Sequence, residues 1–195
     1  MYQNIRKIVL EDISLEYNFK SVTLRKILKL LEFLGALDRQ DKITYETIVD
    51  NTWLDRKEIL HILDILWEYN LINIVKVDSK STNLSSRTQY KIFLFTGDFY
   101  YMFAQMLWKQ IPIWILRESI FVSMLAPLYK ITFPKWWKQN PDFILETKQD
   151  RYLFEIWWKS KTNSQIKKIK GFEQKNIVRD VELDAFPLWL FGFVR

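Results

Sequence analysis

Two acidic residues in the second half of the chain have the type and spacing for metal-assisted chemistry. Asp142 opens the apolar run PDFIL, and Glu155 lies 13 residues later inside the apolar run YLFEIWW. Carboxylate oxygens are the ligands that Mg²⁺ prefers, and a bound divalent ion can activate water and stabilise charge on a phosphodiester. The pair is therefore a candidate site for a divalent ion such as Mg²⁺, which could act on a phosphodiester.

The two acids come together if the runs form a hairpin. A turn centred on Lys148 and Gln149 pairs residues whose numbers sum to 297, so Asp142 stands opposite Glu155. Directly opposed side chains in an antiparallel pair have Cβ atoms about 5 Å apart. Like charges repel at that distance, and a shared cation removes the repulsion. The alternative is a solvent-facing edge pair in which a nearby lysine neutralises Glu155.

The rest of the composition excludes several kinds of site. The 195 residues include no cysteine, one histidine and four glycines. Zinc-thiolate sites, disulfides, histidine-rich metal sites and glycine-rich phosphate loops are thereby excluded. The Ile/Lys-rich, cysteine-free composition is associated with thermophiles.

The helices and strands expected around the two acids would form a small mixed sheet flanked by helices. We expect helices over residues 113–128 and 164–176, and strands over residues 131–137, 141–145, 152–158 and 186–194. The first helix is apolar, but Arg117 and Glu118 in its middle would be costly at a bilayer centre. We therefore expect a buried helix and no membrane span. The N-terminus shows no signal-peptide pattern, so we expect a cytoplasmic protein.

The first half follows the order of a winged helix-turn-helix. Helices are expected over residues 23–37, 44–49 and 54–70, followed by strands over 71–78 and 87–95 with a polar loop over 79–86. Three helices and a two-stranded ribbon are typical of this fold. The DNA-reading helix of the fold would be 54–70, yet its net charge is −2.

Two uses of the winged helix remain open. One is modest DNA contact through the start of the third helix, with Arg56 and Lys57, and through the ribbon, with Lys80 and Arg87. The other is packing against proteins or a neighbouring domain. We expect His61 to be a surface residue on the outer face of the third helix.

Basic residues are concentrated in one block. Residues 130–179 contain 12 Lys/Arg and 5 Asp/Glu, whereas the whole chain carries a net charge of +6. A basic block of this density indicates a polyanionic partner, most simply DNA, although a solvated lysine-rich surface would look the same. The candidate DNA contacts in this block are Lys161, Lys167, Lys168 and Lys170.

The arrangement of acids resembles the PD-(D/E)XK nuclease family. Glu118 falls on a helix, Pro141-Asp142 on a strand and Glu155 on the next strand. The whole chain looks like the C-terminal half of archaeal AAA-type ATPases, a winged helix followed by a restriction-endonuclease-like domain, without the ATPase module. The resemblance rests on ITYETIVDNTWLDRKEILHILDILWEYNLINIVKV, TQYKIFLFTGDF and PDFIL…YLFEIWWKSK. One departure is Trp157, which stands where the family has its lysine.

The resemblance implies a role for each candidate residue. Asp142 and Glu155 would hold Mg²⁺ or Mn²⁺, Glu118 would assist through water or a second metal, and Lys159 would position the nucleophile. The expected α+β chain has a lead-in over residues 1–19, a winged helix over 20–97, a connector over 98–112 and a nuclease-like domain over 113–195. The rival hypothesis is a non-catalytic DNA-binding or protein-interaction module, which includes a subunit that docks onto a separate ATPase.

Overall fold

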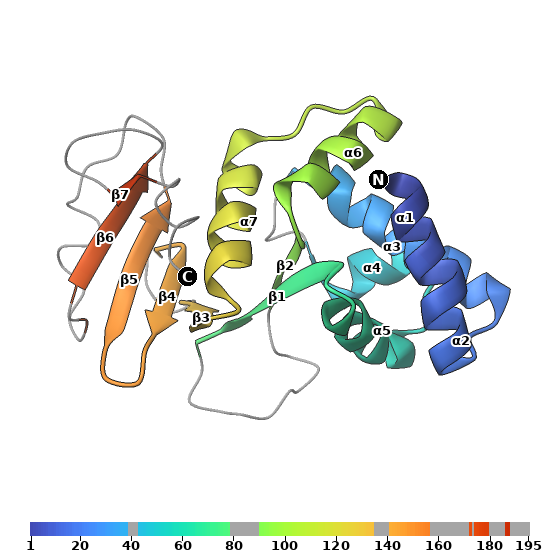
Figure 1. Cartoon of the computed structure of the whole chain (residues 1–195), viewed down its shortest axis with the longest axis horizontal. Coiled ribbons are helices and arrows are strands. Elements are labelled where there is room, and N and C mark those ends of the chain that lie inside the picture. The colour runs from blue at the N-terminus through green and yellow to red at the C-terminus, as the bar shows by residue number, and fades with distance from the viewer. Residues whose placement is uncertain are drawn as a thin grey trace. The chain divides into compact units, whose positions relative to one another are not determined.

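The computed structural model describes residues 1–38, 43–78, 90–134, 141–156, 172, 174–179 and 186–187 (Figure 1). Its fold is mixed α+β, as expected. The chain divides into two compact units. Unit 1 comprises Met1–Ile74 and Lys91–Ile115, and unit 2 comprises Val75–Tyr90 and Leu116–Arg195. Among the residues described, no helix has both the length and the apolar character needed to cross a bilayer.

The lead-in segment of unit 1 is helical. Helix α1 (Tyr2–Lys7), the π-helical turn η1 (Ile8–Asp12) and helix α2 (Ile13–Tyr17) follow one another directly. Ile5, Val9 and Ile13 recur every fourth residue and are buried, so one apolar stripe holds the segment against the unit. Asn18 ends α2 in the left-handed region, at φ 50°.

The next three helices lie close to their expected places. They are α3 (Ser21–Ala36), α4 (Tyr45–Thr52) and α5 (Arg56–Glu68). Thr44 caps α4, because its hydroxyl accepts a hydrogen bond from the Thr47 N–H at 3.1 Å. The helix continues three residues beyond its expected end at residue 49. An apolar stripe of α5 at helical spacing (Ile59, Ile62, Leu63, Leu66) is buried.

The ribbon and one unexpected helix follow. Strand β1 spans Ile72–Val77 and β2 spans Tyr90–Leu94, and the Phe95 N–H donates to the Leu71 carbonyl at 3.0 Å. The expected loop over residues 79–86 lies outside the described residues. The segment 98–112 is more than a connector, since α6 (Gly97–Leu107) occupies most of it. Tyr100, Phe103 and Ala104 are its buried residues, and burial of this face in unit 1 explains why it is helical.

Unit 2 is built around a mixed sheet. Its elements are α7 (Ile113–Leu125, from Leu116 on), β3 (Lys130–Phe133), β4 (Phe143–Glu146), β5 (Arg151–Ile156), β6 (Gln174–Arg179) and β7 (Phe186–Pro187). The strands follow the order β3-β4-β5-β6-β7, and the end of β1 lies beside β3. The β3–β4 and β4–β5 pairs are antiparallel, whereas β5–β6 and β6–β7 are parallel.

Two expected elements of unit 2 are corrected. The helix predicted over residues 164–176 is wrong at its end, because Gln174–Arg179 forms strand β6 beside β5. β-branched Ile177 and Val178 suit a strand that pairs with an apolar neighbour, and this pairing overrides the lysine-rich helical pattern before them. The strand predicted over 131–137 ends at Phe133, before Pro134, which has no N–H to donate. Residues 135–140 and 157–171 lie outside the described part of the chain.

Candidate functional site

The hairpin that carries both acids has the predicted register. Phe143 pairs with Phe154 and Glu146 with Arg151, and the residue numbers of each pair sum to 297. The same register continued by one residue sets Asp142 opposite Glu155. The hairpin prediction is therefore confirmed over the paired residues of β4 and β5.

Asp142 and Glu155 lie at the open end of this hairpin. Asp142 immediately precedes β4, and its Oδ2 accepts a hydrogen bond from the Ile156 N–H at 2.7 Å. Glu155 is the penultimate residue of β5 and only 6% exposed. A carboxylate at that depth needs hydrogen bonds or a counter-charge, because burial of an unpaired charge is costly.

The sheet face to which Glu155 belongs follows from its neighbours. The Phe121 ring on α7 lies 5.3 Å from the Phe143 ring and 5.0 Å from the Phe154 ring, centroid to centroid. Phe143 and Phe154 therefore face α7. Because successive side chains of a strand alternate between faces, Glu155 is directed away from that helix.

Glu118 reaches the same end of the sheet from the α7 side. It is 8% exposed and lies one helical turn before Phe121, hence on the side of α7 that faces the sheet. The C-terminal end of α7 leads through a short turn into Lys130, which pairs with Glu146 at the closed end of the hairpin. The earlier turn of the helix therefore points to the open end of the hairpin (Figure 1).

The candidate metal ligands at this end of the hairpin are two carboxylates, Asp142 and Glu155. Within the ranges that the structure describes, no group of three or more Asp, Glu or His side chains could hold a metal ion. Mg²⁺ needs only one or two protein carboxylates and retains several waters, so Asp142 and Glu155 alone are a chemically suitable pair. Trp157 and Lys159, which complete the sequence prediction, lie outside the described residues.

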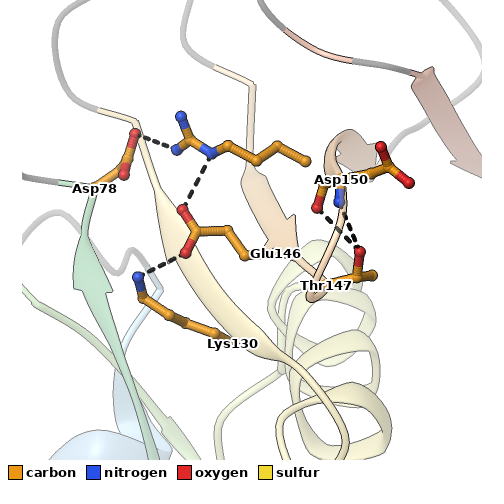
Figure 2. A network of polar contacts seen from close by, with 6 residues as sticks. Asp78, Lys130, Glu146, Thr147 and Asp150 are labelled. Atoms are coloured by element: carbon orange, nitrogen blue, oxygen red, sulfur yellow. Dashed lines mark hydrogen bonds and ion pairs between the residues drawn. The ribbon is translucent and has the colours of Figure 1, made fainter.

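The other end of the same hairpin carries a row of alternating charges, shown in Figure 2. We call it the charged row: Lys130, Glu146, Arg151 and Asp78. Lys130 Nζ lies 2.6 Å from Glu146 Oε2, Arg151 Nε lies 3.0 Å from Glu146 Oε1, and the second contact of the guanidinium is with Asp78 Oδ2 at 2.8 Å. This row was not predicted from the sequence. The Glu146–Arg151 pair could have been predicted, because in the expected register the paired residue numbers sum to 297 and Glu146 stands opposite Arg151.

The proposed DNA contacts are only partly described. Arg56 and Lys57 are exposed at the start of α5, and Arg56 lies 3.5 Å from Glu46. Lys80, Arg87, Lys161, Lys167, Lys168 and Lys170 lie outside the described residues. His61 is exposed on α5, as expected, and its ring contacts Tyr17 at 5.8 Å and Phe19 at 6.1 Å.

Comparison with protein-family models, curated proteins and solved structures gave no match for this chain. The geometry of the site is therefore the basis for assigning a function.

Proposed function

We propose that unit 2 is a PD-(D/E)XK-like domain that hydrolyses DNA phosphodiesters with Mg²⁺ or Mn²⁺. The observation that carries the proposal is the register of β4 and β5, which sets Asp142 opposite a buried Glu155. The order of α7, three antiparallel strands and a parallel fourth strand supports it, because the resemblance implies a helix that precedes the strands bearing the two acids. A cytoplasmic setting belongs to the same proposal.

Three acids and one lysine would have roles in this mechanism. Asp142 and Glu155 would hold the metal, whose chemistry is to activate water and to stabilise charge on the phosphate. Asp142 is fixed by the Ile156 N–H, so one carboxylate oxygen is already oriented. The resemblance would give Glu118 the task of holding or orienting water, although Glu118 lies on the α7 side of the sheet and Glu155 is directed away from α7. Lys159 would position the nucleophile in place of the lysine that Trp157 replaces.

Unit 1 is a winged helix within the same proposal. The order α3, α4, α5, β1, β2 supports this assignment. Its DNA contacts would be Arg56 and Lys57, at the N-terminal end of α5.

The test is cleavage of plasmid, branched and single-stranded DNA with Mg²⁺ or Mn²⁺. Asp142→Asn and Glu155→Gln should each lower the rate at least about a hundredfold, because the metal loses a ligand. Asp150→Asn is the matched control, since Asp150 is an acid of the same hairpin at its closed end, and its rate should equal that of the wild type. Cleavage that survives both site variants would refute the proposal.

A second candidate is a non-catalytic module that binds DNA or docks onto a separate ATPase. The bond from the Ile156 N–H to Asp142 favours it, because it gives the acid a structural task that requires no metal. The net negative charge of α5 also favours protein contact over DNA contact. Salt-sensitive DNA binding without cleavage would support a DNA-binding module. Absence of both binding and cleavage would favour the docking subunit.

A further inference from the structure

We propose that Thr147 and Arg151 are positioning residues that set the register of the β4–β5 hairpin. This register sets Asp142 opposite Glu155. The effect of the register on metal binding rests on the proposed function. The register itself is a property of the hairpin and can be tested without metal or DNA.

The apolar residues of the hairpin do not define its register. Phe143, Ile144 and Leu145 are apolar on both faces of β4, and Glu155 alone interrupts the apolar residues Leu153, Phe154 and Ile156 of β5. A one-residue slip exchanges the faces of a strand, and alternation of apolar and polar residues normally opposes it. Here that alternation is missing, so the register must be set elsewhere.

Thr147 closes the turn through its backbone and its side chain. The Thr147 N–H donates to the Asp150 carbonyl at 2.9 Å. The Thr147 hydroxyl oxygen accepts hydrogen bonds from the Asp150 N–H at 3.0 Å and from the Gln149 N–H at 3.3 Å. The same hydroxyl donates a hydrogen bond to the Asp150 carbonyl at 3.2 Å. Figure 2 shows the contacts between Thr147 and Asp150. They fix the length of the turn, and turn length fixes hairpin register.

Arg151 adds a charge constraint at the first pair after the turn. It stands directly opposite Glu146, with Nε 3.0 Å from Oε1. The guanidinium also reaches Asp78 at 2.8 Å and lies 5.3 Å from the centre of the Phe172 ring. A slip by one residue would turn Arg151 to the α7 face and separate it from these partners.

The absence of cysteine allows the register to be read by disulfide formation. Leu145 and Tyr152 are directly paired, so Leu145→Cys/Tyr152→Cys reports the native register. Leu145→Cys/Leu153→Cys reports a slip, because these residues face opposite sides in the native hairpin. Opposed strand residues have Cα separations within the range that a disulfide spans. The crosslinked fraction is measured by mass spectrometry after mild oxidation.

Each reporter pair is placed in four backgrounds: the wild type, Thr147→Ala/Arg151→Ala, the conservative Thr147→Ser, and Lys130→Ala. Lys130→Ala is the matched control, since Lys130 belongs to the charged row but not to the hairpin. The double variant should lower the native-to-slipped ratio about three- to tenfold, in keeping with the loss of a cross-strand pair and a turn bond. Thr147→Ser and Lys130→Ala should leave the ratio within about twofold of the wild type.

An unchanged ratio in the double variant would overturn the proposal. A parallel loss of both crosslinks would also overturn it, because the hairpin would then open without slipping. A shifted ratio without nuclease activity in the wild type would support the positioning role and refute only the proposed function.

Discussion

The Asp142 carboxylate accepts a hydrogen bond from the Ile156 N–H at 2.7 Å, which ties the start of β4 to the end of β5. This bond lies at the open end of the hairpin, farthest from the turn. It holds Asp142 beside Glu155 even without a cation. The acid therefore has a structural role that is independent of any catalytic one, and the two roles can be separated by substitution.

Asp142→Ala should destabilise unit 2 by about 1–3 kcal/mol, because the Ile156 N–H loses a charged acceptor. Asp142→Asn retains a side-chain oxygen and should cost less than half as much. Urea unfolding at neutral pH measures both values. Equal losses for Ala and Asn would show that the charge of Asp142, and not the bond to Ile156, stabilises the fold.

Divalent ions should stabilise the wild type and not the Glu155→Gln variant. A metal at a hundredfold excess over its Kd adds about 2.7 kcal/mol to the free energy of unfolding, which raises the melting temperature. Without metal, the melting temperature of Glu155→Gln gives the baseline from which its metal response is measured. Asp150→Asn should retain the metal response. The melting temperatures are measured by calorimetry with and without Mg²⁺. An equal rise in the melting temperatures of Glu155→Gln and Asp150→Asn would contradict a metal site at Glu155.

Gly35→Ala should destabilise unit 1 although alanine is the better helix former. A Cβ at Gly35 would lie 2.6 Å from Phe103 Cβ and 2.9 Å from Phe103 Cγ, so α3 and α6 would have to move apart. Overpacking of this kind costs about 1–3 kcal/mol, whereas the helix propensity returns about 1 kcal/mol. Thr23→Ala, in the same helix, should be neutral or slightly stabilising in the same denaturant titration. A stabilised Gly35→Ala would show that the two helices do not approach so closely.

The pH dependence of unit 1 should reflect Tyr69. The hydrogen bond that its hydroxyl donates to Glu16 raises the pKa of Tyr69 to about 12, from an ordinary value of about 10. Because the folded-state pKa is raised, this stabilisation is fully present below pH 10 and is lost as the pH rises from about 10 to about 12. Tyr69→Phe should lack that loss, so its free energy of unfolding should converge with that of the wild type at high pH.

Absorbance at 295 nm follows the ionisation of tyrosine directly. Glu16→Gln should move the ionisation of Tyr69 back toward pH 10, since the carboxylate acceptor is gone. A titration curve unchanged by Glu16→Gln would contradict the assignment of the shift to this bond.

Patterns that are local in sequence predicted much of the fold. The buried residues of α3 and α5 recur at helical spacing, and Thr44 is followed by a short amphipathic run. The β4–β5 hairpin was also predictable, because its polar turn is short and both flanking runs are apolar. The candidate acids follow from that hairpin, so the pairing of Asp142 with Glu155 could be inferred from residue spacing.

Contacts between distant segments decided the rest. Residues 174–176 continue a helical pattern in sequence, yet they form a strand because β5 offers a parallel partner. Helix α6 was not predicted from the sequence. It packs its Phe103 against Gly35 of α3. The charged row joins Asp78 to Arg151 across 73 positions of the chain.

The helical stripes, the hairpin and the two acids on it are encoded locally, because each depends on residues only a few positions apart along the chain. Long-range packing decided which strand lies beside β5, which face of the sheet α7 covers, and how deeply Glu155 is buried. Those features depend on surfaces brought together from separate parts of the chain, and the energy of such burial is not encoded at any one position.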